Sequence, residues 1–456
     1  MELTTDKSAA LESTAKDKAS IRKVVGASMA GTVAEWYEFF IYGIASTLVF
    51  SKLFFPSSGV GVSVFDGIIA AFATYAVGFL ARPIGGLVFG HFGDKYGRKK
   101  LLQISLILVG ASTFLIGCIP GYASIGYMAP VLLVILRFIQ GFAVGGEWGG
   151  AMLLVSEHSD EKRRGFYSSF LQAAAPAGSV AASLVLLTLS MTLPEESFLA
   201  WGWRVAFWLS AVIIIIGYYI RKNVEESDVF KASLEKQEAT RKSSAGLKEV
   251  LKYYPKQAIC GMLMRVGENS AYYIIVVFSI TYLSVQHHIG YTTMLLLLLC
   301  ANTFHFFAMI FGGHLSDKFG RKNIMMFGYV GILLWMPFYF HGLDQGSFAV
   351  TLFAMCVGLF FQGVTYSGQG AVLAEIFPTR MRYSGVSFCY QVAGILAGSI
   401  APMIATMLWK EFGSTLPVII YILSISVMSM IAIFLLKESK HKSLKEIDLE
   451  DRKNIA

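Results

Sequence analysis

A ten-residue pattern occurs twice in this chain, each time in a basic turn between two apolar stretches. The copies cover residues 90–99 and 313–322, so they lie 223 residues apart. Seven of the ten positions are identical without a gap. We therefore predict that the chain contains two copies of one structural unit.

The composition indicates that both units lie in a membrane. Hydrophobic residues make up 55% of the 456 residues, charged residues only 15%, and the mean hydropathy is +0.59. Apolar stretches of about 20 residues, long enough to cross a hydrocarbon layer about 30 Å thick, recur along the chain. The predicted spans are 24–50, 66–90, 101–119, 129–155, 166–192, 203–220, 257–284, 292–313, 323–341, 348–374, 384–409 and 416–436.

A second pair of matching segments supports the repeat. Glu157 and Arg164 follow the fourth span, Glu375 and Arg382 follow the tenth, and both matches have an offset of 218 residues. The sequence therefore predicts an all-α polytopic membrane protein, with twelve transmembrane helices in two six-helix pseudo-repeats. An internal repeat of this size in so apolar a protein is typical of a transporter.

Basic residues concentrate in alternate loops, which predicts that both termini are cytoplasmic. The formal net charge of +8 is thus interpreted as a topology signal, and nucleic-acid binding is not expected. Because the first twenty residues are polar, we expect no cleaved signal peptide. The predicted domains are an N-terminal tail (1–23), a six-helix bundle (24–220), a cytoplasmic linker (221–256), a second six-helix bundle (257–436) and a C-terminal tail (437–456).

Other classes of site lack a signal. The five cysteines are odd in number, scattered and without a Cys-x-x-Cys pair, so neither a disulfide framework nor a metal site is expected. No phosphate-binding loop or nucleophile–base pattern suggests an enzyme or a cofactor. The paired basic turns favour a protein that switches between states over a passive channel.

Small residues and prolines mark places where helices pack closely or bend. Gly141, Gly145 and Gly149 lie four residues apart in the fourth span, which puts them on one helix face. They predict either static close packing or a sliding interface. Pro176 and Pro402 are expected to kink the fifth and eleventh spans.

These motifs resemble the major facilitator superfamily and, within it, the metabolite:proton symporter family. The resemblance covers residues 20–440, and it implies the major facilitator fold and a carrier of shikimate, α-ketoglutarate, citrate, or proline and betaine. Its motifs are Gly-x-x-x-Asp-x-x-Gly-Arg-Lys after spans two and eight, Arg137-x-x-Gln140-Gly141, Glu35-Trp36-Tyr37-Glu38-Phe39, Phe79-x-x-Arg82-Pro83-x-Gly85, Gly141-Phe142-x-Val144-Gly145-Gly146-Glu147 and Trp201-Gly202-Trp203-Arg204.

Ionisable residues inside a membrane span are costly, so each is a candidate for function. Glu35 and Glu38 lie roughly 16 and 21 Å into the first span at 1.5 Å per residue, and they share a helix face. They are predicted to carry protons, with a structural pairing to Arg137 as the alternative. The resemblance implies a proton-coupling role for Arg137. Glu147 is either a further proton relay or a partner of a neighbouring helix.

The seventh span supplies the candidate substrate site. Arg265 and Glu268 have a spacing similar to that in shikimate-type relatives, which makes Arg265 the first candidate for binding a substrate carboxylate. A self-satisfied local ion pair is the alternative. Tyr37, Tyr272 and Gln391 are further candidates for substrate binding.

The repeated turns supply the candidate gate. Asp94 with Arg98 and Asp317 with Arg321 lie at the predicted cytoplasmic face, where a carboxylate can bind a helix end or an arginine and hold one conformation. The sequence thus predicts proton-driven import of a small organic acid across a bacterial inner membrane by a protein active as a monomer. Uptake of a zwitterion such as proline or betaine is the alternative.

Overall fold

The computed structural model describes residues 2–55, 64–96, 98–145, 147–222 and 247–438. For some of these, including 2–20 and 90–102, only the backbone is described. The described residues form helices joined by short turns, and they contain no strand. Residues 223–246, which form most of the predicted linker, lie outside this part.

The first six predicted spans correspond to helices of the N-terminal half. The elements are α1 (Glu2–Ala45), η1 (Ser46–Phe50), α2 (Ser51–Leu53), α3 (Val64–Tyr96), α4 (Arg98–Ile116), α5 (Tyr122–Ile125), α6 (Met128–Val144), α7 (Glu147–His158), η2 (Glu161–Arg163), α8 (Arg164–Gln172), α9 (Ala174–Thr192), α10 (Glu195–Ser197), η3 (Phe198–Gly202), α11 (Trp203–Trp208) and α12 (Ser210–Lys222).

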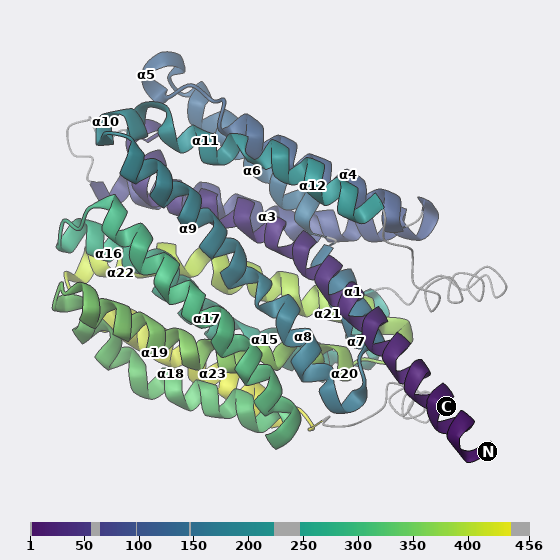
Figure 1. The fold of residues 1–456 in the computed structure, drawn as a ribbon. Coiled ribbons are helices and arrows are strands. Elements are labelled where there is room, and N and C mark those ends of the chain that lie inside the picture. The colour runs from purple at the N-terminus through teal and green to yellow at the C-terminus, as the bar shows by residue number, and fades with distance from the viewer. Residues whose placement is uncertain (1, 56–63, 97, 146, 223–246, 439–456) are drawn as a thin grey trace.

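The C-terminal half repeats this arrangement. Its elements are α14 (Leu247–Tyr253), α15 (Pro255–Tyr273), η4 (Ile274–Phe278), α16 (Ser279–Gln286), α17 (Tyr291–Phe319), α18 (Arg321–Asp344), α19 (Phe348–Ser367), α20 (Gln369–Glu375), α21 (Thr379–Ala393), η5 (Gly394–Ser399), α22 (Ile400–Phe412) and α23 (Leu416–Leu435). Figure 1 shows the two halves as separate groups of helices that meet along one long interface.

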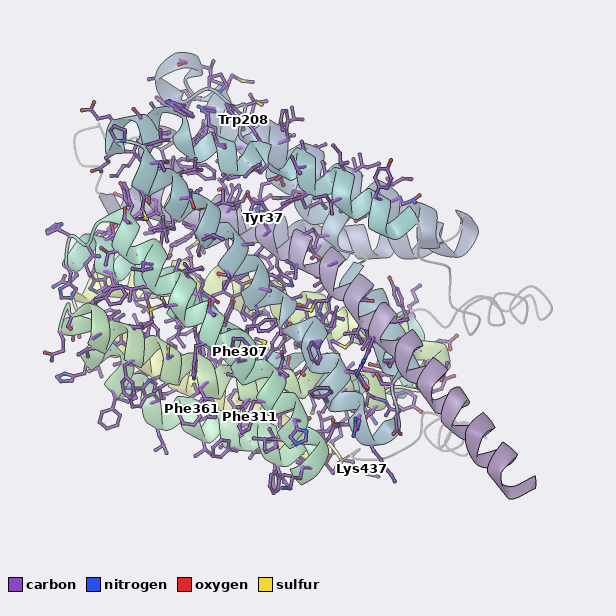
Figure 2. The ribbon with its side chains drawn as sticks, in the orientation of Figure 1. Tyr37, Trp208, Phe307, Phe311, Phe361 and Lys437 are labelled. Atoms are coloured by element: carbon purple, nitrogen blue, oxygen red, sulfur yellow. The ribbon has the colours of Figure 1, made fainter. Side chains whose placement is uncertain are left out.

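Nine helical segments of the described chain are long and apolar enough to cross a membrane. The other three predicted spans are α1, α4 and α15. Helices α1 and α15 carry the charged residues singled out above. The described apolar part of α4 is only Gln103–Ile116. Large apolar side chains cover the outside, as expected where lipid is the solvent: Phe307 and Phe311 (Figure 2) lie one turn apart on α17 and are 64% and 50% exposed.

Both prolines predicted to kink a helix lie just after an interruption of the regular α-helix. Helix α8 ends at Gln172, four residues before Pro176, and α9 begins two residues later. A proline ring clashes with the carbonyl group four residues earlier, so the break falls where the ring forces it. The turn before Pro402 is the π-helical segment η5, in which each backbone hydrogen bond joins residues five apart instead of four.

Gly141 and Gly145 of the fourth span provide close packing between α6 and α3. A Cβ atom on Gly141 would lie 1.9 Å from the carbonyl oxygen of Gly78, and one on Gly145 would lie 1.9 Å from that of Arg82. From the other helix, a Cβ on Gly85 would lie 1.7 Å from the oxygen of Phe142. The two backbones are therefore in direct contact, which no residue with a side chain would permit.

Candidate functional site

A chain of buried hydrogen bonds links three helices of the N-terminal half. Arg137 on α6 donates to Oε1 of Gln140, and Nε2 of Gln140 lies 2.6 Å from the hydroxyl of Thr113 on α4. That hydroxyl lies 2.9 Å from Oε2 of Glu38 on α1. Sequence analysis assigned proton coupling to Glu38 and Arg137, with a structural pairing as the alternative. In the structure, two neutral side chains lie between them.

Arg137 lies in an aromatic cage. Its guanidinium carbon is 4.1 Å from the ring centre of Tyr42, 4.8 Å from that of Tyr75 and 4.9 Å from that of Phe39. Such rings stabilise a cation through their negative faces. Gly78 makes room, since a Cβ there would lie 2.6 Å from Nε of Arg137. Within the described chain, Nε and Nη2 of this arginine have no hydrogen-bond partner.

A small pocket adjoins this arginine. Glu35, Arg82, Arg137 and Gln140 are its polar lining residues. The guanidinium of Arg82 lies 4.7 Å from the ring of Phe39, whose ring also contacts Arg137. The pocket therefore brings two cations and one of the two predicted proton carriers together.

The C-terminal half holds a second buried charged cluster. Nη1 of Arg265 lies 3.7 Å from Oε1 of Glu268, so the predicted local ion pair is present. The same nitrogen lies 3.2 Å from Oε1 of Gln369, and Nε2 of Gln362 lies 2.5 Å from the other oxygen of Glu268. Tyr329 accepts a hydrogen bond from the backbone of Glu268 and fixes this part of α15.

Arg265 also lies at the contact between the halves. Its guanidinium carbon is 3.6 Å from the ring centre of Tyr390 and 5.2 Å from that of Tyr366. Trp148 of α7, in the N-terminal half, stacks on the ring of Tyr390 with 3.4 Å between the ring centres. A cation, two tyrosines and a tryptophan thus meet at the contact between the halves.

The other predicted substrate residues have specific positions. Tyr272 lies in the centre, with its ring 6.0 Å from Phe40 of the N-terminal half. Gln391 joins the halves by donating to the backbone oxygen of Gly145 at 2.8 Å. Tyr37 is directed into its own half, where its hydroxyl donates to the backbone oxygen of Ala206. Their roles in binding remain predictions.

A network of buried ion pairs, which we call the clamp, joins the halves at the end that carries the repeated basic turns. It consists of Arg164, Asp317, Arg321 and Glu375. Glu375 lies 2.8 Å from Arg164 of the N-terminal half and 2.9 Å from Arg321 of its own half. Arg321 also lies 2.9 Å from Asp317.

The carboxylate of Asp317 completes the clamp by binding a helix end. Its two oxygens accept hydrogen bonds from the backbone N–H groups of Gly165 and Phe166, at 2.9 and 2.8 Å. These amides begin α8 in the opposite half, where the helix dipole favours a negative charge. The contact has the geometry that the gating prediction requires for Asp317 and Arg321.

The halves also touch at the opposite end and in the middle. Nζ of Lys410 lies 2.5 Å from Asp66, and Lys52 donates to the hydroxyl of Tyr291. In the middle, the ring of Tyr273 packs against Phe39, Phe79 and Tyr75 of the other half. The two halves are thus in contact at both ends and at the centre.

Three predicted residues lie where the structure gives no side-chain description. They are Asp94, Arg98 and Glu147. Their predicted roles remain predictions.

Comparisons with known proteins fit this architecture. The sequence profile described as "Sugar (and other) transporter" matches residues 23–450. The chain belongs to this transporter family, which is part of the major facilitator superfamily. The resemblance inferred from the motifs is therefore confirmed.

Curated relatives are similar over nearly the whole chain. An inner membrane metabolite transport protein of Escherichia coli is 39% identical, with 93% of this chain and 96% of the relative covered. The shikimate transporter of the same organism is 35% identical, with 92% and 95% covered. Its proline/betaine transporter is 31% identical, with 96% and 89% covered.

A solved structure of the proton:xylose symporter XylE bound to 6-bromo-6-deoxy-D-glucose has the same fold. Its TM-score is 0.77 at 16% sequence identity, with 95% of this chain and 99% of that chain covered. The predicted fold class, two six-helix repeats in a twelve-helix membrane protein, is confirmed.

Several residues of the site were not recognised from sequence. Thr113 is one polar residue in an apolar span, and nothing in its neighbourhood marks it. Arg82 was noted only as part of a motif. Arg164 and Glu375 carried a usable signal, because both belong to the segments that match at an offset of 218 residues.

We predict that Glu375→Gln opens the clamp end. Its carboxylate is shared by two buried arginines, and removing one partner of a buried ion pair costs about 3–5 kcal/mol. A cysteine in place of buried Ser169, beside Gly313 of the other half, would report the opening through faster reaction with a water-soluble thiol reagent. The assay uses a chain without its native cysteines.

Asp66→Asn is the matched control for this experiment. It removes the charge of the pair with Lys410 at the opposite end, where both side chains are 39% exposed. Exposed pairs contribute about 0–1 kcal/mol, so labelling at position 169 should not change. Equal labelling in Glu375→Gln and the parent chain would show that the clamp does not hold this end closed.

Proposed function

We propose that this chain is a proton-coupled symporter that imports a small organic acid by alternating access. The observation that carries the proposal is the setting of Glu38, which is 2% exposed and bonded to the neutral hydroxyl of Thr113. No ion pair with Glu38 occurs in the part of the chain that the structure describes. A buried carboxyl group with a neutral partner can exist with or without its proton, as a proton carrier requires.

The proposed anion site is Arg265. A guanidinium stays charged and offers paired N–H donors that match a carboxylate. Nε of Arg265 has no hydrogen-bond partner among the described residues. Tyr366, Tyr390 and Trp148 around it suit the apolar body of a small cyclic or branched acid. The similarity to a shikimate transporter supports this class of substrate.

The proposed cycle uses the contacts between the halves. The clamp end is the cytoplasmic end, as the basic loops predict, and the opposite end faces outward in a bacterial inner membrane. The organic acid and the proton enter from outside, the occluded state follows, and breaking the clamp releases both inside. One chain contains every part of this cycle, so we propose that it works as a monomer.

The experiment that tests the function is uptake into proteoliposomes. Labelled shikimate, α-ketoglutarate, citrate and betaine are offered with and without an inward proton gradient. We expect one of the acids to accumulate with the gradient and to be released by a protonophore. If all of them only equilibrate and the gradient has no effect, the proposal of proton-coupled acid uptake is wrong.

A zwitterionic osmolyte is the second candidate. It is favoured by the aromatic rings at the centre, because such rings also recognise quaternary ammonium groups, and by the similarity to a proline/betaine transporter. Accumulation of betaine alone in the same assay would select this function. Arg265 would then lose its proposed role as the site of a substrate anion.

A further inference from the structure

The hydroxyl of Thr113 has more partners than it has hydrogens. It lies 2.9 Å from Oε2 of Glu38, 2.9 Å from the backbone oxygen of Val109 and 2.6 Å from Nε2 of Gln140. Thr113 is fully buried, so water does not compete for these bonds. A hydroxyl group donates one hydrogen and accepts up to two.

The direction of each bond follows from the chemistry of the partners. Arginine has no acceptor, so the oxygen of Gln140 must face Arg137 and its amide nitrogen must face Thr113. The Thr113 oxygen therefore accepts from Gln140 in every state. Its single hydrogen can therefore be donated either to Glu38 or to Val109, whose oxygens are equally distant.

The protonation state of Glu38 determines which of the two oxygens accepts the hydrogen of Thr113. An ionised carboxylate can only accept, so the hydrogen of Thr113 must point to it. A protonated carboxyl group brings its own hydrogen, which can be donated to the Thr113 oxygen. The hydroxyl of Thr113 then turns to the backbone oxygen of Val109, and the bond between α1 and α4 reverses its direction.

We propose that Thr113 is a positioning residue that couples the proton on Glu38 to Arg137 through Gln140. This inference rests on the proposed function, because it takes Glu38 as the proton carrier. It adds a route by which protonation of Glu38 affects Arg137, although the described residues show no direct ion pair between the two. When Glu38 is protonated, the Thr113 oxygen accepts from Glu38 as well as from Gln140, so the bond from the Gln140 amide weakens. The oxygen of the same amide accepts from the guanidinium of Arg137, which therefore responds to the proton on Glu38.

The other groups around Glu38 are consistent with this role. On its own helix, Glu35 lies one turn earlier and Tyr37 is adjacent. On α6, Arg137 lies behind Gln140. The apolar Ile214 of helix α12 and the second oxygen of Glu38 both lie close to Gly110, and helix α9 packs against α1 at Gly178. Thr113 is thus the group that connects the carboxyl of Glu38 with α6.

The test is an infrared titration of the purified full-length protein, which needs no substrate. The carboxyl band that is missing in Glu38→Gln is assigned to Glu38, and the pH at which this band is half lost is measured in each variant. Thr113→Val keeps the shape of the side chain but cannot donate to the carboxylate. We expect its midpoint to move upward by about one pH unit or more.

Two variants complete the test. Thr113→Ser keeps the hydroxyl and should restore the midpoint of the parent chain. Ser112→Ala is the matched control, because among the described residues the hydroxyl of Ser112 bonds only to the backbone oxygen of Leu108 on its own helix. Its midpoint should equal that of the parent chain.

The outcomes separate this inference from the proposed function. If the Glu38 band titrates and Thr113→Val leaves its midpoint unchanged, the coupling role of Thr113 is wrong and the function stands. If no titrating band disappears in Glu38→Gln, then Glu38 exchanges no proton and both proposals are wrong. A shift in Thr113→Val that serine does not reverse would assign the effect to packing and overturn the role of the hydroxyl.

Discussion

Replacing Glu38 with glutamine is expected to abolish gradient-driven accumulation while leaving exchange of substrate across the membrane intact. Glutamine has nearly the same shape and can still bond to Thr113, but it cannot carry a proton. A gradient of one pH unit supplies about 1.4 kcal/mol per proton, or about tenfold accumulation, and the variant should lose all of it. Counterflow of labelled against unlabelled substrate, which needs no proton movement, should persist.

Two further variants make this experiment decisive. Glu411→Gln makes the same change at an exposed position at the end of α22 and should accumulate substrate like the parent chain. Glu35→Gln tests the other predicted carrier, which lines the pocket beside Arg137. If both Glu35→Gln and Glu38→Gln accumulate substrate normally, neither carboxyl group takes part in coupling.

Gly141→Ala is expected to have the largest effect on stability. The new methyl group would lie 1.9 Å from the carbonyl oxygen of Gly78, and neither backbone can move without disturbing the contact between α6 and α3. Overpacking of this kind costs about 3 kcal/mol. The thermal midpoint of the protein in detergent should fall clearly below that of the parent chain.

The control for this substitution is Gly26→Ala. Gly26 is also in a helix, and no atom lies within 4 Å of the place its Cβ would take. Because alanine favours helix more than glycine does, the midpoint should stay or rise slightly. Equal midpoints for the two variants would show that the close contact of α3 and α6 does not limit stability.

The sequence was sufficient for the architecture because the relevant signals are long or repeated. Apolar length reveals a membrane span without knowledge of its neighbours, and the copied turns at 90–99 and 313–322 relate the two halves. Proline and glycine act on the backbone itself. For that reason the break before Pro176 and the close packing at Gly141 could be predicted from single residues.

The site was only partly predictable, because its connections depend on how helices face one another. Charged residues in spans identified Glu38 and Arg137, but sequence gave no reason to place Thr113 between them. Likewise, Gln391 was a reasonable candidate for a substrate contact, and its bond to the backbone of Gly145 depends on the meeting of the halves. Helical periodicity shows which residues share a face and leaves their partners undetermined.

The clamp has a consequence for how fast the protein can turn over. Two of its contacts cross between the halves, Arg164 with Glu375 and Asp317 with the start of α8. The bonds of Arg321 to Glu375 and Asp317 lie within one half, so separation of the halves does not require them to break. Both carboxylates thus keep a counter-ion when the halves part, which avoids the cost of an isolated charge. We expect this shared neutralisation to lower the barrier to separation of the halves at this end.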